Sequence, residues 1–235
     1  HAENLIVFRF DMLKAMAEKH TVIACVPENG STSANKIVQQ KLAEVGIDFI
    51  TVKMERTGTN PLFDICTIWN LYKIIKLVKP DQTFSYTAKP VIFGSIAAKL
   101  AGVKKIYSMI TGLGSNYVQQ DLKTRVIRLV MNNLYRIALS FNTKVFFQNQ
   151  DDVAEFAEQK IFQDPSRTVL TNGSGVNLEH FTHMPLPIDK IRFLLTTRFI
   201  LTKGVMEYLT AATQIKQQYP QVEFLLVGWY ENKDE

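Results

Sequence analysis

The sequence predicts an α/β protein in which a parallel β-sheet is covered by helices on both faces. Short apolar runs alternate along the chain with longer segments in which apolar residues recur every three or four positions. Such alternation is typical of parallel βαβ units. The chain has 235 residues, of which 46% are hydrophobic, and this is enough to form the core of one large domain and part of another.

The expected strands are short, apolar and rich in β-branched or aromatic residues. They cover residues 21–26, 49–52, 82–86, 105–110, 144–148, 168–170, 191–195 and 222–227. Helical spacing of apolar residues predicts helices over 5–19, 33–45, 62–79, 91–100, 122–141, 151–159 and 204–219. Because the chain opens on a helix, we expect a first strand and its glycine-rich turn upstream of residue 1.

A segment with two prolines, Pro185 and Pro187, separates two regions of regular alternation. We therefore predict an N-terminal Rossmann-like domain over residues 1–183, a linker over 184–190 and the beginning of a second Rossmann-like domain over 191–235. The last region holds one βαβ unit, too little for an independent two-layer domain. The second domain is expected to be truncated.

Composition limits the partners of the protein. A net charge of +5 and a pI near 9.1 suit anionic ligands or an anionic membrane surface. Cys25 and Cys66 lie within apolar patterns, which predicts buried thiols in a reducing cytoplasm. No uncharged apolar run is long enough to span a membrane, and no basic-aromatic stripe suggests nucleic-acid binding. We expect a cytoplasmic protein whose membrane contact, if any, is peripheral.

The most informative motif is Arg198, at the end of a predicted strand, followed by Lys203-Gly204 at the start of a predicted helix. Backbone N–H groups and the helix dipole favour an anion at such a position. Arg adds a planar fork for phosphate oxygens and Lys a compact charge, a combination that suits a diphosphate. An ordinary exposed strand–loop–helix junction is the alternative reading.

Two segments are both apolar and basic, 121–136 and 53–79. A basic amphipathic helix can lie on an anionic membrane. The alternative is a helix packed on the core with a solvated basic face.

Several motifs in one order resemble those of the retaining glycosyltransferases of family 4. They are Phe8-Arg9-Phe10, Tyr86-Thr87-Ala88-Lys89-Pro90, Ile110-Thr111-Gly112-Leu113-Gly114, Thr171-Asn172-Gly173-Ser174-Gly175, and Arg198 with Lys203-Gly204. The resemblance implies the GT-B fold, in which two Rossmann-like domains face a cleft. Within the family, the chain is most similar to bacterial enzymes that build surface glycans, such as capsule or O-antigen, on undecaprenyl diphosphate.

The resemblance implies transfer of a hexose or N-acetylhexosamine from a nucleotide-diphosphate sugar, a UDP-sugar, to a lipid-linked saccharide, with retention of anomeric configuration. It implies no cofactor, no metal ion, and peripheral contact with the cytoplasmic face of the inner membrane. Arg198 and Lys203 would be catalytic, because fixed positive charge stabilises the departing nucleotide. The implied donor-binding residues are Gly173, Ser174, Gly175, Arg198, Lys203 and Gly204. The implied acceptor-binding residues are Arg9, Lys89, Thr111, Gly112 and Gly114.

The sequence also departs from the family. Thr111 stands near the place where many members have a histidine that contacts the donor sugar. The family's pair of donor-binding glutamates, eight positions apart, has no candidate here, so we expect this polypeptide to lack a complete donor site. A nucleotide-sugar epimerase of the same architecture and a non-catalytic module that binds an acceptor or partner remain alternatives.

Overall fold

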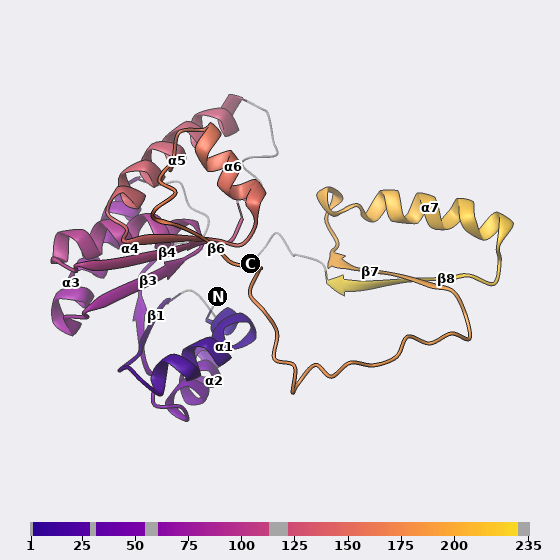
Figure 1. Cartoon of the computed structure of the whole chain (residues 1–235), viewed down its shortest axis with the longest axis horizontal. Coiled ribbons are helices and arrows are strands. Elements are labelled where there is room, and N and C mark those ends of the chain that lie inside the picture. Colours follow the sequence, from indigo (N-terminus) through magenta and orange to yellow (C-terminus); the bar gives the residue numbers. More distant parts are fainter. Residues whose placement is uncertain (1, 29–31, 55–60, 113–121, 230–235) are drawn as a thin grey trace. The chain divides into compact units, whose positions relative to one another are not determined.

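The computed structural model describes residues 2–28, 32–54, 61–112 and 122–229. The chain forms two compact units, His1–Asn177 and Leu178–Glu235 (Figure 1). The linker predicted over 184–190 lies within the second unit. Each unit is described by itself.

The centre of the first unit is a four-stranded parallel sheet with the strand order β3-β4-β5-β6. Its strands are β3 (Gln82–Tyr86), β4 (Lys105–Ile110), β5 (Lys144–Phe147) and β6 (Thr168–Leu170). They are connected in turn by α4 (Ala88–Ala101), α5 (Leu122–Ser140) and α6 (Gln150–Glu158). Each connection is a βαβ crossover, which is what the alternation of strand-like and helix-like segments in the sequence predicts.

The rest of the first unit is built around a second parallel pair, β1 (Ile23–Pro27) with β2 (Asp48–Val52). The helices α1 (Glu3–Ala17) and α2 (Thr32–Ala43) accompany this pair, and α3 (Pro61–Val78) leads from β2 to β3. Figure 1 shows α1 and α2 on the opposite side of the strands from α4 and α5. Among the described residues, β1 is hydrogen-bonded only to β2, and β3 only to β4.

Helix α4 lies between α3 and α5 and is the most deeply buried helix of the first unit. It packs closely on β3 because residue 94 is glycine: a Cβ at Gly94 would lie 2.7 Å from the Ser85 Oγ. Phe147 contacts Phe156 edge to face, and Phe156 contacts Tyr135 in the same way. These aromatic side chains tie α5 and α6 to β5.

The second unit contains one parallel βαβ unit formed by β7 (Arg192–Arg198), α7 (Val205–Gln218) and β8 (Glu223–Trp229). A short 3₁₀ turn, η2 (Leu201–Lys203), leads into α7. Gly228 is paired with Thr197 in the sheet, and a Cβ at Gly228 would overlap the Thr197 carbonyl. Only glycine fits this position without a backbone shift.

The predicted fold class is confirmed, with parallel strands and helices on both faces. Several bounds differ from the prediction by up to three residues, and two differences have a clear physical reason. Helix α4 begins at Ala88 and not at residue 91, because Thr87 turns the chain with a φ of 67° directly after β3. Cys25 and Cys66 are exposed, since β1 alternates its faces and Cys66 lies on the outer side of α3. Nearby protein atoms still shield the Cys25 thiol from water and raise its pKa to about 11.

Candidate functional site

The carboxyl ends of the four strands β3–β6 lie at one edge of the sheet, because the strands are parallel. In open α/β sheets, ligands bind beyond this edge. Tyr86, Ile110, Phe147 and Leu170 end the four strands. The segments that follow them contain most of the residues predicted to bind the acceptor and part of those predicted to bind the donor.

Arg9 reaches this edge from α1. Its side chain is 6% exposed, and its guanidinium carbon lies 5.2 Å from the centre of the Tyr86 ring. Its Nη2 lies 3.3 Å from the Met109 Sδ, while its Nε has no hydrogen-bond partner. No carboxylate among the described residues pairs with this cation. A buried guanidinium without a carboxylate partner can donate hydrogen bonds to a phosphate or carboxylate of a ligand.

The electrostatic effect of Arg9 extends to Tyr86. Burial raises the pKa of the Tyr86 phenol, and the positive charge of Arg9 partly opposes this rise. The cation therefore acts on a phenol at the end of β3.

Lys89 lies in the first turn of α4, at the same edge of the sheet. Its ammonium group donates to the Asp64 carboxylate on α3 at 3.0 Å, and both side chains are mostly buried. The ammonium also lies 5.9 Å from the centre of the Phe93 ring. Lys89 is thus held by Asp64 in the first turn of α4 and is not a solvated loop lysine.

Thr111 and Gly112 directly follow β4, and both are exposed. Gly112 has a φ of 118°, a conformation that L-residues with a side chain rarely adopt. Gly114, the third predicted residue of this loop, lies outside the described residues.

Gly173, Ser174 and Gly175 follow β6 in an exposed turn. Both glycines have positive φ, 81° and 71°, and the space where a Cβ would stand is open at each. The Gln148 amide after β5 donates to the Ser174 hydroxyl at 2.8 Å, so this turn is tied to the neighbouring strand end.

Arg198, Lys203 and Gly204 lie together in the second unit. Arg198 ends β7 and is half-buried, whereas Lys203 is exposed at the end of the 3₁₀ turn. Gly204 has a φ of 75° and is the N-cap residue of α7. The expected junction of strand and helix is therefore present, and between them lies the 3₁₀ turn η2, which the sequence analysis did not predict.

The structure gathers Arg9, Lys89, Thr111 and Gly112 at the sheet edge of the first unit, and Arg198, Lys203 and Gly204 at one junction of the second. Sequence reasoning did not identify Asp64, which holds Lys89, or Gln148, which holds Ser174. Asp64 is the single acidic residue of α3, and this was a signal in the sequence.

The outer faces of α3 and α5 are strongly apolar. On α5, exposed apolar side chains follow one stripe, at Leu122, Val126, Leu129, Val130 and Ile137. The opposite face contributes Tyr135, Ala138 and Leu139 to the core. The helix α5 thus packs on the core through one face and exposes apolar side chains on the other. Within the described ranges, no helix is long and apolar enough to cross a membrane.

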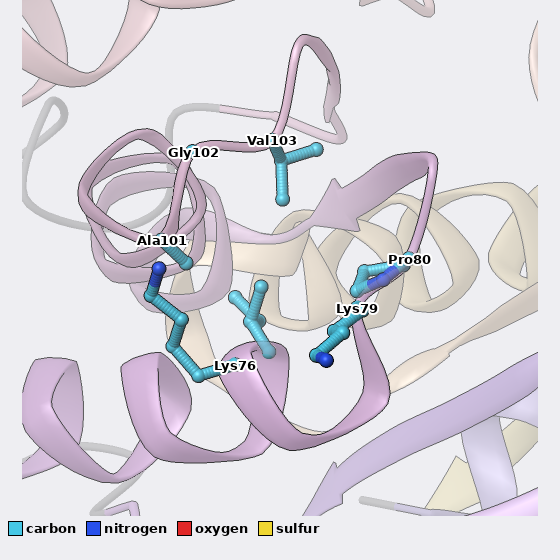
Figure 2. Close-up of a pocket in the computed structure, with 7 residues that line it drawn as sticks. Lys76, Lys79, Pro80, Ala101, Gly102 and Val103 are labelled. Carbon is cyan, nitrogen blue, oxygen red and sulfur yellow. The ribbon is translucent and has the colours of Figure 1, made fainter.

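A shallow cavity of about 290 Å³ lies at the other end of the sheet, where the chain enters β3 and β4. Figure 2 shows Lys76 and Lys79, from the end of α3, on two sides of this cavity, with Gly102 and Val103 above them. It lies at the amino ends of the strands, away from the edge where the predicted site residues gather.

Many classes of protein share a parallel α/β architecture with basic side chains at the carboxyl edge of the sheet, so the sequence comparison is needed to identify the family. Residues 2–149 match the family described as glycosyl transferase 4-like. The chain belongs to this family.

Two curated relatives are similar to the chain. One is the N,N'-diacetylbacillosaminyl-diphospho-undecaprenol alpha-1,3-N-acetylgalactosaminyltransferase of Campylobacter jejuni, 29% identical over 235 residues, or 94% of this chain and 59% of that protein. The other is the UDP-Gal:alpha-D-GlcNAc-diphosphoundecaprenol alpha-1,3-galactosyltransferase of Escherichia coli, 29% identical over 119 residues, or 50% of this chain and 29% of that protein. The chain thus spans less than two thirds of the length of either relative.

Solved structures share the fold. A structure of Anabaena HepE in complex with UDP and glucose has a TM-score of 0.65 at 15% identity, covering 94% of this chain and 57% of that one. A glycosyltransferase from Rickettsia africae has a TM-score of 0.60 at 16% identity, covering 95% and 65%. A UDP-GlcNAc 2-epimerase from Neisseria meningitidis has a TM-score of 0.55 at 14% identity, covering 93% and 61%. Both transferases and epimerases share the fold, so the fold alone does not distinguish the reactions.

Proposed function

We propose that this chain forms the acceptor-binding part, and the beginning of the donor-binding part, of a retaining glycosyltransferase of bacterial surface-glycan synthesis. The enzyme transfers a hexose or N-acetylhexosamine from a UDP-sugar to a saccharide linked to undecaprenyl diphosphate. The observation that carries the proposal is Arg9, a buried cation at the carboxyl edge of the sheet that has no carboxylate partner among the described residues. Similarity over 94% of the chain to an enzyme with an undecaprenyl-diphosphate-linked acceptor supports it.

In the proposed reaction, the bond between the anomeric carbon and the UDP oxygen breaks, and a bond to the acceptor hydroxyl oxygen forms. Arg198 and Lys203 neutralise the negative charge that grows on UDP, which lowers the barrier to its departure. The acceptor proton passes to a phosphate oxygen of the departing UDP, so the products are the extended saccharide and protonated UDP. No metal ion is required in this scheme, because two side chains supply the positive charge.

On the acceptor side, Arg9 and Lys89 bind the diphosphate or the first sugar. A charge-assisted hydrogen bond contributes about 1.5–3 kcal/mol, so loss of either cation should weaken acceptor binding by about 10- to 100-fold. Thr111 and Gly112 form the adjoining loop, where an absent side chain lets the sugar approach the backbone. Gly173, Ser174 and Gly175 contribute to the donor side.

A lipid-linked acceptor places the enzyme at the cytoplasmic face of the inner membrane. We propose that this contact is peripheral. The exposed apolar faces of α3 and α5 support it.

The epimerase alternative is supported by fold similarity alone, at 14% identity for the Neisseria meningitidis enzyme. It predicts turnover of a free UDP-sugar with no acceptor. The family match over residues 2–149 favours the transferase.

The test is transfer from radiolabelled UDP-sugars to a short-chain polyprenyl-diphosphate saccharide by the product of the complete reading frame that contains this chain. We expect a lipid-linked product whose formation survives EDTA. Arg198→Ala and Lys203→Ala should lower kcat by about 100-fold or more, the usual effect of removing a group that stabilises the leaving charge. Lys89→Ala should weaken acceptor binding to the 235-residue chain, measured by calorimetry.

Lys41→Ala is the matched control, because Lys41 is an exposed lysine in the last turn of α2. It should leave both measurements unchanged. Epimerisation of UDP-sugar without acceptor would establish the alternative. Acceptor binding that is equal in the wild type and Lys89→Ala would exclude the assigned role of Lys89.

A further inference from the structure

Helix α3 has an outer face with the chemistry of a membrane-surface helix. Seven of its exposed side chains lie within one narrow stripe along the helix. They are Leu62, Ile65, Cys66, Trp69, Lys73, Lys76 and Leu77. Their spacing of three, four and seven residues places them on one side of an α-helix. We name this set the α3 stripe.

The inner face of α3 is already occupied by the protein. Thr67 and Leu71 are buried, and Ile68, Ile74 and Ile75 pack against the core. The residues of the α3 stripe are therefore distinct from those by which α3 packs on the core. Trp69 is 56% exposed and Leu62 is 73% exposed, although burial in water-free surroundings would favour both side chains.

The charge of the α3 stripe has one sign. Lys73 and Lys76 belong to it, while Asp64 faces the other side and is paired with Lys89. The two lysines lie against aromatic rings, Lys73 at 5.5 Å from the centre of the Trp69 ring and Lys76 at 5.9 Å from that of Tyr72. Trp69 and Tyr72 are stacked with their ring centres 5.2 Å apart.

Anionic phospholipid surfaces favour this combination of groups. Exposed leucine, isoleucine and tryptophan enter the boundary between headgroups and acyl chains, and lysine heads remain at the phosphates. Tryptophan and tyrosine are enriched at this depth because their rings are apolar with one polar atom. A surface that binds another protein has no general need to exclude carboxylates, whereas a surface that binds an anionic membrane does, and the α3 stripe contains none.

The direction of α3 connects this surface to the proposed site. Its first turn contains Asp64, which holds Lys89 at the carboxyl edge of the sheet. Its last turn leads to the cavity lined by Lys76 and Lys79 (Figure 2). A helix lying flat on the membrane would hold the carboxyl edge beside the headgroups, where a lipid-linked diphosphate lies.

We propose that the α3 stripe is the surface by which this chain docks on anionic phospholipid membranes. The inference deepens the proposed function, because it names the membrane-contacting surface. Its physical basis is the exposure of the apolar side chains of the stripe together with the single sign of its charge.

The test is binding of the 235-residue chain to vesicles of phosphatidylcholine with and without phosphatidylglycerol, at low and high salt. We expect binding to the anionic vesicles, weakened by salt. The double variant Lys73→Glu with Lys76→Glu should bind about 30-fold more weakly, equivalent to about 1 kcal/mol for each lysine near an anionic surface. The matched control is Lys19→Glu with Lys41→Glu, which changes the net charge equally at two exposed lysines, one just after α1 and one in the last turn of α2. It should bind within about twofold of wild type, because general charge acts weakly at a distance.

A second measurement reports on Trp69 directly. Trp69 and Trp229 are the two tryptophans of the chain, so Trp229→Phe leaves Trp69 as the single fluorophore. Brominated acyl chains in the vesicles should quench its fluorescence. Vesicle binding without this quenching, or equal binding by the two double variants, would overturn the proposal. So would dimerisation through the stripe without lipid, abolished by Trp69→Ala.

Failure of this test is distinguishable from failure of the proposed reaction. The vesicles contain neither donor nor acceptor. With a detergent-soluble short-chain acceptor, the Lys73→Glu, Lys76→Glu enzyme should transfer sugar at the wild-type rate.

Discussion

Replacing Arg9 by methionine separates the structural cost of a buried cation from its proposed role in binding. Arg9 has a guanidinium that is almost fully buried, a free Nε, and no carboxylate partner among the described residues. A buried, unsatisfied donor costs about 1–3 kcal/mol. Methionine fills similar space, and loss of the contact with the Tyr86 ring costs about 1 kcal/mol. We therefore expect Arg9→Met to stabilise the chain by about 1 kcal/mol.

The same substitution should remove an anion site. If pyrophosphate binds beside Arg9, a concentration ten times its Kd stabilises the wild type by about 1.4 kcal/mol. For a domain of this size that corresponds to a rise in Tm of about 3–6 °C. Arg9→Met should show no such rise, and its Tyr86 pKa should be higher, because the opposing charge is gone.

The assays are urea unfolding followed by circular dichroism, thermal melts with and without pyrophosphate, and ultraviolet titration of tyrosine. Arg167→Met is the contrasting control: Arg167 is paired with Asp164 and bonded to several carbonyl oxygens, so its loss should destabilise the chain and leave the effect of pyrophosphate intact. A clear loss of stability in Arg9→Met without anion would refute the reasoning. So would equal stabilisation of both variants by pyrophosphate.

Three further predictions follow from single contacts. Asp64→Asn should free Lys89 and weaken acceptor binding by about 3- to 10-fold, roughly the 1 kcal/mol of one partly buried ion pair. Asp64→Glu should restore part of the lost affinity, and an acceptor affinity that calorimetry finds unchanged in Asp64→Asn would exclude a positioning role for Asp64. Gly228→Ala should destabilise the second unit by about 1–3 kcal/mol, because the new Cβ overlaps the Thr197 carbonyl. A thermal melt in which the second unit of this variant unfolds at the wild-type temperature would contradict this. Hydrogen bonds from Lys190 and Arg192 lower the pKa of Glu223 to about 2, below its ordinary 4.5. The ionised carboxylate therefore contributes fully to the stability of the folded chain above pH 4.5, and this contribution is lost as the pH falls toward 2. Acid unfolding of Glu223→Gln should lack this dependence, and a curve that overlies the wild type would rule it out.

The sequence by itself determined the order and type of the elements in the described residues. Buried parallel strands are apolar runs in the sequence, and helices have apolar residues at a spacing of three or four. The local pattern was therefore sufficient to identify both kinds of element. The junction of Arg198, Lys203 and Gly204 was predictable for the same reason, because strand, turn and helix follow one another in the chain.

Only the tertiary structure decided which charges meet. Arg9 reaches Tyr86 and Met109 across 77 and 100 positions of the chain, and Lys89 meets Asp64 across 25. Such contacts depend on which helix face turns toward which strand end, and no local pattern encodes this. The exposure of Cys25 and of Trp69 was decided in the same way: an apolar pattern identifies residues that gain from burial, and the packing of neighbouring elements determines which of them are buried.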